Sequence, residues 1–308
     1  MGTRAAANLV AIAVAIAAGG YARDRWLPPA RHELAEAEAF WVLKTHQPPR
    51  YDIVMAGDSR TYRGASPSAM RVILPTLRVL NFGYSSGGLA PPLLEAAAAK
   101  LDPAGARVIV LGVSPFSLTP MAAENGHFKS FLHQAPRLYE PSPWAAGMQR
   151  YFDPIIDSPA LALQREINAP PEGLYYHEDF FDDGWVGSWT RPEDPTRAIK
   201  DYQETFAKTR VSPVVAGELF EQVRHWTDAG IQVFAFRPPT TQAMVALENE
   251  VSGYDEVEVA ARLTQAGAVW LDFSSASYRT YDGSHLHEAA AAVFSLDLAR
   301  AMEARLRR

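Results

Sequence analysis

Several residue types and motifs are missing from this chain, and each absence removes a class of function. Cysteine does not occur among the 308 residues, which excludes disulfides, thiolate metal sites and a cysteine nucleophile. Basic residues are too few for a nucleic-acid partner, because 29 Lys and Arg stand against 35 Asp and Glu and no basic stripe runs along the chain. Neither a P-loop nor a Gly-x-Gly-x-x-Gly fingerprint is present, so we expect no cofactor.

An uncharged apolar stretch lies close to the N-terminus. Residues 5–18 are mostly Ala, Val, Ile and Leu, and Gly19-Gly20 follows. This is long enough for the core of a signal peptide, and extension through Ala22 brings it close to a membrane-spanning length. We therefore expect residues 1–22 to be a signal anchor or a signal peptide. The rest of the chain is then expected in the bacterial cell envelope, in the periplasm or outside the cell.

The charges around this stretch leave its orientation open. Arg4 lies on one side, and Arg23, Arg25 and Arg31 lie on the other, so the positive-inside rule does not choose between the two orientations. An Ala-rich helix buried in a cytosolic protein would give the same pattern. A soluble cytosolic protein is therefore an alternative.

The chain that follows has the composition of a globular protein, with 48% hydrophobic and 21% charged residues. Residues 23–50 are expected to form a juxtamembrane helix and a linker. The apolar spacing over residues 31–44 is that of one amphipathic helix, and Gln47-Pro-Pro-Arg50 interrupts the chain after it. The main domain then spans residues 51–308.

Short apolar runs alternate with amphipathic segments in this domain. The runs predict strands at Ile53–Ala56, Arg78–Phe82, Arg107–Leu111, Ile231–Phe236 and Ala268–Phe273. Helices are predicted at Ser66–Leu74, Leu89–Leu101, Val214–Ala229, Gln242–Ala266 and Leu286–Leu306. Continuous apolar strands between helices indicate a parallel sheet that is covered on both faces. The expected fold class is α/β, a three-layer α/β/α sandwich with a central parallel sheet.

One segment, at about residues 117–211, is too long to be a simple connection. It is rich in proline, aromatic residues and acids, and includes the run Tyr175-Tyr-His-Glu-Asp-Phe-Phe-Asp-Asp-Gly-Trp185. A long insertion of this kind is commonly a lid, a binding surface or a disordered excursion. Aromatic faces with interleaved carboxylates would suit sugar rings, and packing of the insertion onto the sandwich is the simpler explanation for most of these aromatics.

Two short motifs near opposite ends of the domain together indicate serine chemistry. Gly57-Asp58-Ser59 follows the first predicted strand, and Asp282 precedes His285 by three residues at the start of the last helix. A serine at a strand exit lies at the edge where open α/β folds place their sites. Its hydroxyl needs a base, and we expect His285 to be that base, with Asp282 holding its Nδ1.

These motifs give the chain a resemblance to the SGNH (GDSL-type) hydrolase superfamily over roughly residues 51–306. The resemblance implies a Ser59–His285–Asp282 triad and an oxyanion hole that begins with the Ser59 amide. The family's second block matches the run Asn81-Phe-Gly-Tyr-Ser-Ser-Gly-Gly88, which places the amide of Ser86 or that of Gly87 in the hole. The third block, usually Gly-x-Asn-Asp, reads Gly112-Val-Ser-Pro115 here, so Ser114 stands where the family has asparagine.

The missing asparagine removes a donor worth a few kcal/mol in the transition state. Ser114 replaces it weakly, another donor such as Arg60 or Arg237 takes over, or the rate is modest. We expect Arg60 and Arg237 to bind substrate. Arg237 ends a predicted strand, and an ion pair with Glu248 or Glu250 is an equally weighted alternative for it.

The third block also directs the resemblance towards particular members of the superfamily. Membrane-linked members that acylate cell-surface polymers, such as the alginate O-acetylation proteins, also lack this asparagine. The resemblance therefore implies a serine O-acyl esterase or O-acyltransferase that acts on acetyl esters of cell-envelope or secreted polysaccharide. A membrane-bound acyltransferase is a further expected partner.

Two alternatives were weighed against this function. Asp282, His285 and His287 could be read as a metal site, but no third ligand has convincing spacing, and we expect no metal. A second reading is a non-catalytic component of a polysaccharide modification or export complex that keeps the fold to bind sugars. The substituted third block supports this reading, and the intact Gly-Asp-Ser and Asp-x-x-His motifs argue against it.

Overall fold

The computed structural model describes residues 33–124, 126–136 and 173–306. The chain forms two compact units, the first from residues 1–43 and 135–171 and the second from residues 44–134 and 172–308. Of the first unit, the described part consists of residues 135–136 and most of helix α2 (Glu33–Thr45). The predicted apolar helix at residues 1–22 lies outside the described residues. Within the described ranges, no helix combines the length and apolarity that a membrane crossing requires.

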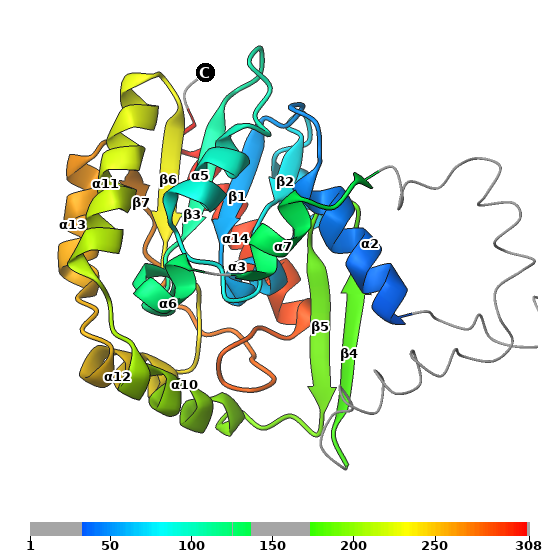
Figure 1. The fold of residues 1–308 in the computed structure, drawn as a ribbon, viewed down its shortest axis with the longest axis vertical. Coiled ribbons are helices and arrows are strands. Elements are labelled where there is room, and N and C mark those ends of the chain that lie inside the picture. The colour runs from blue at the N-terminus through cyan, green and yellow to red at the C-terminus, as the bar shows by residue number, and fades with distance from the viewer. Residues whose placement is uncertain (1–32, 125, 137–172, 307–308) are drawn as a thin grey trace, which may run out of the picture. The chain divides into compact units, whose positions relative to one another are not determined.

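A five-stranded parallel sheet forms the centre of the second unit (Figure 1). Its strand order is β2-β1-β3-β6-β7. The strands are β1 (Ile53–Gly57), β2 (Val79–Asn81), β3 (Val108–Gly112), β6 (Gln232–Phe236) and β7 (Val269–Trp270). All five predicted strands are present, although the last has only two residues. Every residue of the first four strands is buried, as expected for a parallel sheet that is covered on both faces.

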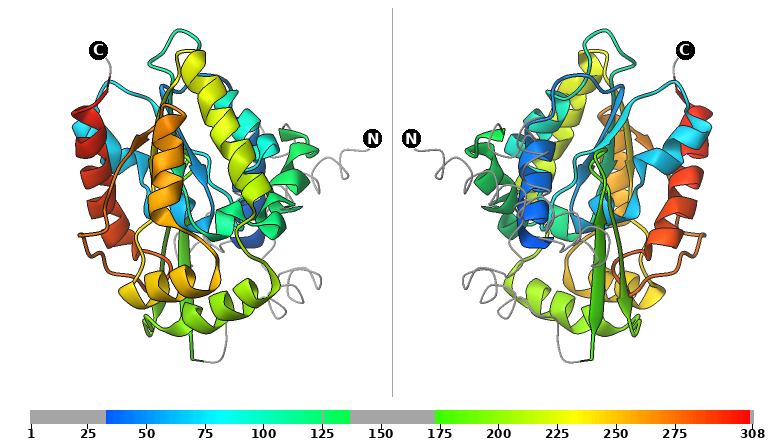
Figure 2. Two further views of the ribbon diagram at one scale, coloured as in Figure 1. Left: turned by 90° about the vertical axis from the view of Figure 1, so that its left-hand side faces the viewer. Right: turned by 90° about the vertical axis from the view of Figure 1, so that its right-hand side faces the viewer.

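Helices cover both faces of this sheet (Figures 1 and 2). Helix α4 (Pro67–Ile73) packs against α14 (Glu288–Glu303) on one face. Helices α5 (Pro91–Ala98) and α11 (Pro213–Asp228) contact each other and the other face, and α13 (Glu256–Gln265) packs against α11 and β7. Ser66 is the N-cap of α4, because its hydroxyl accepts a hydrogen bond from the Ala69 amide at 3.4 Å. The fold is thus α/β with a central parallel sheet flanked by helices.

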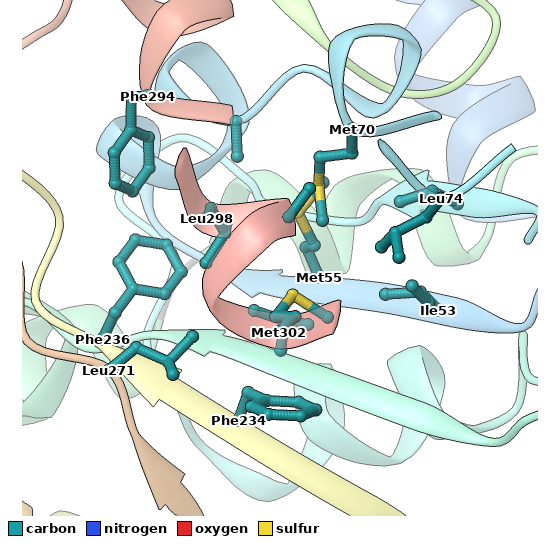
Figure 3. Close-up of a cluster of buried hydrophobic side chains, with 14 of the residues drawn as sticks. Ile53, Met55, Met70, Leu74, Phe234, Phe236, Leu271, Phe294, Leu298 and Met302 are labelled. Atoms are coloured by element: carbon teal, nitrogen blue, oxygen red, sulfur yellow. The ribbon is translucent and has the colours of Figure 1, made fainter. Parts of the chain in front are cut away.

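The main hydrophobic core lies between the sheet and α14. Figure 3 shows Phe294, Leu298 and Met302 of α14 directed towards Met55 of β1 and Phe236 of β6. All five side chains are almost completely buried. This core holds the start of α14, and therefore the segment just before it, in a fixed position relative to the end of β1.

The predicted helix at 242–266 is wrong in one respect, because it is two helices. Helix α12 (Gln242–Val251) ends at Ser252, and Gly253 has a φ of +76°, a value that favours glycine. Asp255 then caps α13 by accepting a hydrogen bond from the Glu258 amide at 3.0 Å. The break redirects the chain, so that residues of both helices reach the same buried arginine.

The described part of the 117–211 insertion contains regular structure. A 3₁₀ turn (Phe116–Leu118), α6 (Pro120–Ala123) and α7 (Gly126–Leu132) come before the undescribed residues, and α10 (Arg197–Lys208) ends the insertion and packs against α12. Between them lies an antiparallel hairpin of β4 (Tyr175–Phe180) and β5 (Val186–Arg191). Strand β5 packs against α14 and the short helix α3 (Ser59–Gly64), so the insertion reaches the region of the sequence-predicted site.

Candidate active site

The predicted nucleophile Ser59 is the first residue of α3, directly beyond the carboxyl end of β1. Asp58 is the N-cap of α3, and its Oδ1 accepts a hydrogen bond from the Arg60 amide at 3.0 Å. The carboxylate thus satisfies an amide at the start of the helix that would otherwise lack an acceptor. Glycine is required before Asp58, because a Cβ on Gly57 would lie 2.1 Å from Thr61 Oγ1. The close approach lets α3 sit directly on the ends of the strands, with Ser59 partly accessible.

The segment Tyr281–His285, here named the His285 loop, completes the predicted triad. Asp282 Oδ2 lies 2.7 Å from His285 Nδ1, and His285 Nε2 lies 2.9 Å from Ser59 Oγ. Asp282 Oδ1 accepts hydrogen bonds from the amides of Ser284 at 2.8 Å and His285 at 2.7 Å. The turn therefore folds the carboxylate back onto the imidazole, and the sequence-predicted residues Ser59, His285 and Asp282 form one continuous hydrogen-bonded chain.

The electrostatics of the pair suit a general base. Burial lowers the pKa of His285, and the opposing effect of the Asp282 carboxylate does not fully offset it, so the pKa lies below the ordinary value of 6.5. Burial raises the pKa of Asp282, but the attraction of His285 and the hydrogen bonds outweigh it and hold that pKa below its usual range. At neutral pH the imidazole is neutral and the carboxylate is ionised. Nδ1 then donates to Asp282, and Nε2 accepts the Ser59 proton.

The loop after β2 lies against the turn that carries Ser59 and contains the two predicted amide donors, Ser86 and Gly87. The two amides have different surroundings in the structure. The Gly87 amide donates to Tyr84 O at 3.0 Å, so the prediction of Gly87 as an oxyanion donor is wrong. Ser86 has a φ of +52°, a left-handed conformation that is uncommon for serine. Among the described residues, no acceptor pairs with the amides of Ser59 or Ser86. The oxyanion role therefore stays a prediction for the amides of Ser59 and Ser86.

Ser114, the residue in place of the third-block asparagine, has another role. Its hydroxyl donates to Asp58 Oδ2, and its amide donates to Ser117 Oγ at 3.1 Å. The side chain is completely buried. The prediction of Ser114 as an oxyanion donor is therefore wrong, because its hydrogen-bonding capacity is used to hold the carboxylate that caps α3.

Substitution of Ser114 distinguishes its structural role, as the partner of Asp58, from the role of an oxyanion donor. We expect Ser114→Ala to lower the free energy of unfolding by about 1–3 kcal/mol, because a buried carboxylate oxygen loses its donor. The kcat for an ester should fall much less than the roughly 10²-fold that loss of an oxyanion donor costs. Urea unfolding and steady-state kinetics measure both. A large loss of kcat at unchanged stability would restore the oxyanion role.

The predicted substrate-binding residues Arg60 and Arg237 are also structural. Both are buried, and both pair with Glu248 of α12: Arg60 Nη1 lies 2.7 Å from Glu248 Oε1, and Arg237 Nη2 lies 2.9 Å from Glu248 Oε2. Arg237 Nη1 contacts Glu256 Oε2 at 2.8 Å. Neither guanidinium is available to bind substrate or an oxyanion. The ion-pair alternative for Arg237 is confirmed with Glu248 as the partner.

Sequence analysis missed a second serine pattern and the surroundings of His285. Gly83-Tyr84-Ser85-Ser86-Gly87 matches Gly-x-Ser-x-Gly, the elbow of α/β-hydrolases. In the structure this run is a loop, the next helix begins only at Pro91, and Ser85 hydrogen-bonds to the Tyr62 side chain. His285 is bonded to Ser59 instead, which identifies Ser59 as the serine with a base.

The surroundings of His285 come from its own loop, from α3 and, through α3, from the insertion. The Tyr281 ring stacks on the imidazole, with 5.8 Å between the ring centroids and 16° between the planes. Arg63 Nη1 donates to Tyr281 Oη at 3.2 Å, and Arg63 Nη2 donates to Glu178 Oε1 of β4 at 2.9 Å. No sequence signal connects Glu178 to the triad, because the contact depends on how the hairpin packs.

Two further features of the described residues bear on the site. Within them, no group of three or more His, Cys, Asp or Glu side chains is placed to hold a metal ion. A cavity of about 570 Å³ lies at the amino end of β1 and β2, near Tyr51 and Val79, away from the carboxyl edge that carries the triad. Its arginines Arg71 and Arg78 contact Asp183 and Asp52.

No family model, no curated protein and no solved structure matches this chain.

Proposed function

We propose that the protein is a serine O-acyl esterase or O-acyltransferase of the SGNH type, built on a three-layer α/β/α sandwich. The observation that carries the proposal is the continuous hydrogen-bonded chain from Asp282 through His285 to Ser59. The Ser59 hydroxyl lies 2.9 Å from the imidazole at the carboxyl edge of a parallel sheet, where open α/β folds bind their ligands, and the order of contacts is that of a Ser-His-Asp triad.

The proposed reaction proceeds through an acyl-enzyme. Ser59 Oγ attacks the ester carbonyl while His285 Nε2 takes its proton, and the amides of Ser59 and Ser86 stabilise the oxyanion. The C–O bond to the leaving alcohol breaks, and that alcohol takes the proton from His285. A second hydroxyl group then attacks acyl-Ser59 and loses its proton to His285. The bond from the acyl carbon to Ser59 Oγ breaks, and Ser59 takes that proton from His285. The attacking hydroxyl belongs to water in an esterase or to a polysaccharide in a transferase.

The outer face of the β4–β5 hairpin supports a polysaccharide substrate. Alternate residues of the hairpin point to opposite faces, so Glu178 faces Arg63 beside the triad while Tyr175, His177 and Trp189 share the other face. The Trp189 ring centroid lies 5.3 Å from that of Tyr175 and 5.1 Å from that of His177. Aromatic faces pack against the C–H faces of sugar rings, and the Asp179 carboxylate next to them can accept hydrogen bonds from sugar hydroxyls.

Truncation of Trp189 tests this surface. We expect Trp189→Ala to raise the KM for an O-acetylated polysaccharide about tenfold, because one stacking contact is lost, and to leave the KM for a small acetyl ester unchanged. The matched control is Phe181→Ala, which removes an aromatic ring at the turn of the same hairpin. Equal KM changes for polymer and small ester in Trp189→Ala would contradict a polysaccharide-binding role for this face.

The proposed location is the bacterial cell envelope, with residues 1–22 as a membrane anchor or signal and with a membrane-bound acyltransferase as a candidate partner.

The second candidate function is a catalytically weak or inactive binding or scaffold component of a polysaccharide modification or export complex. The loss of the third-block donor favours the scaffold, and the aligned Ser59 and His285 favour the enzyme. Acetate release from a chromogenic acetyl ester and from an O-acetylated polysaccharide decides between them, because a scaffold releases none from either.

A further inference from the structure

Four charged side chains form a chain of ion pairs that begins at the residue after the nucleophile; Arg60, Glu248 and Arg237 are buried, and Glu256 at the far end is 30% exposed. Arg60 of α3 pairs with Glu248 of α12, Glu248 pairs with Arg237 after β6, and Arg237 pairs with Glu256 of α13, at distances of 2.7, 2.9 and 2.8 Å. The side chains of Arg60 and Glu248 are 1% and 0% exposed. Burial of two such charges is costly, and the cost is offset only when the geometry of the pair is good.

One end of this chain is bonded to the catalytic machinery. Arg60 Nε donates to Ser284 Oγ at 2.9 Å, and the Arg60 guanidinium carbon lies 4.6 Å from the centroid of the Tyr202 ring of α10. Ser284 lies in the His285 loop, and its amide donates to Asp282 Oδ1 at 2.8 Å. A rigid path therefore runs from the Arg60 side chain through Ser284 to the group that orients His285.

The backbone of Arg60 is fixed to the turn that carries the nucleophile, while its side chain is bonded to the His285 loop. Arg60 follows Ser59 directly, and its amide is fixed by the Asp58 cap. Ser59 and His285 are separated by 226 residues, and they meet at a single hydrogen bond of 2.9 Å. Other contacts fix the loop from α10 and α12, where the Ala198 amide donates to Asp282 O at 3.0 Å and the Thr241 amide donates to Gly283 O at 3.1 Å. Arg60 bonds to both the nucleophile helix and the His285 loop.

We propose that Arg60 is a positioning residue that fixes the separation of Ser59 Oγ and His285 Nε2 by joining α3 to the His285 loop through Ser284. The role rests on the proposed function, because it concerns the alignment of the same nucleophile and base. Arg237, the second arginine of this chain of ion pairs, has the same charge as Arg60 and also pairs with Glu248. Unlike Arg60, it has no hydrogen bond to the His285 loop. Arg237 therefore serves stability without setting the triad.

The test compares Arg60→Lys with Arg237→Lys in the full chain. Each substitution keeps the positive charge and loses the planar guanidinium and the hydrogen bonds that depend on it. For Arg60→Lys we expect kcat for a small acetyl ester to fall on the order of 10²-fold, as for a misplacement of about 1 Å, while KM stays within about twofold. For Arg237→Lys we expect a kcat close to that of the wild type. The urea midpoint should decrease by a similar amount in both variants.

Ser284→Ala provides a second variant in case Arg60→Lys does not fold. It removes the acceptor of the Arg60 Nε–H bond and leaves the Arg60–Glu248 ion pair, and its kcat should also fall at constant KM. Equal losses of kcat in Arg60→Lys and Arg237→Lys, or none in Ser284→Ala, would overturn the proposal.

A structural readout separates this proposal from the proposed function. In a crystal structure of Arg60→Lys or Ser284→Ala, the Ser59 Oγ to His285 Nε2 distance should exceed about 3.2 Å, the limit for proton transfer. A distance that stays at the wild-type 2.9 Å would contradict the positioning role whether or not the wild type turns over an ester. Absence of turnover in the wild type would contradict the proposed function alone.

Discussion

Replacement of Ser59 by alanine is expected to lower kcat for a small acetyl ester by roughly 10⁶-fold, to the rate that oxyanion stabilisation alone supports. The hydroxyl is the atom that attacks, and His285 Nε2, at 2.9 Å, then has no proton to accept. The fold should not change, because Ser59 is a partly exposed first residue of α3 and the cap is provided by Asp58. Steady-state hydrolysis of a chromogenic acetyl ester measures the effect.

Ser85→Ala is the matched control for this experiment. Ser85 lies in the Gly83–Gly87 run that matches the α/β-hydrolase elbow, but in the structure it hydrogen-bonds to Tyr62, whereas the His285 imidazole bonds to Ser59. We expect Ser85→Ala to keep turnover close to that of the wild type. Turnover lost in Ser85→Ala and kept in Ser59→Ala would show that the nucleophile had been misassigned.

The second large effect is expected for Asp282→Asn, which should reduce kcat about 10⁴-fold while the protein stays folded. Asp282 accepts the Nδ1 proton of His285 at 2.7 Å and thereby leaves Nε2 free to take the serine proton. An amide at this position can donate to Nδ1, which favours the tautomer with the proton on Nε2. In that tautomer the imidazole has no lone pair facing Ser59, and the general base is lost.

The pH dependence gives an independent readout of the same pair. The base must be neutral, so kcat/KM of the wild type should rise with pH through the pKa of His285, with a midpoint below the ordinary value of 6.5 because burial lowers that pKa. The carboxylate of Asp282 opposes this lowering. In Asp282→Asn the residual activity should therefore rise at a still lower pH. A midpoint that moves upwards would contradict the arrangement.

The triad could be predicted from sequence because its elements are local. Gly57-Asp58-Ser59 is a strand exit, and Asp282 and His285 are three residues apart, so each half forms within one turn. The parallel sheet was predictable for a similar reason, because four of its strands are continuous buried apolar runs. Only the meeting of Ser59 with His285 required long-range packing, and the core between the sheet and α14 provides it.

The role of Arg60 could not be predicted in this way, and the sequence left that of Arg237 open between substrate binding and an ion pair with Glu248 or Glu250. Both residues lie at strand exits, which is where ligands bind in open α/β folds. Their actual partner, Glu248, lies on α12, and the second partner of Arg237, Glu256, reaches it only because the chain breaks between α12 and α13. Amphipathic spacing continues across that break, so the sequence pattern predicted one long helix. The hydrogen bond from Ser114 to Asp58 could not be predicted either, because the two residues follow different strands and meet only when those strands pair in the sheet.

The nucleophile is tested most directly by treating the folded protein with a fluorophosphonate ester and mapping the adduct by mass spectrometry. We expect a single covalent adduct on Ser59, in which the serine oxygen is bonded to phosphorus and fluoride has left, and no adduct in His285→Ala. A folded protein that remains unlabelled, or that is labelled at another serine, would contradict the account.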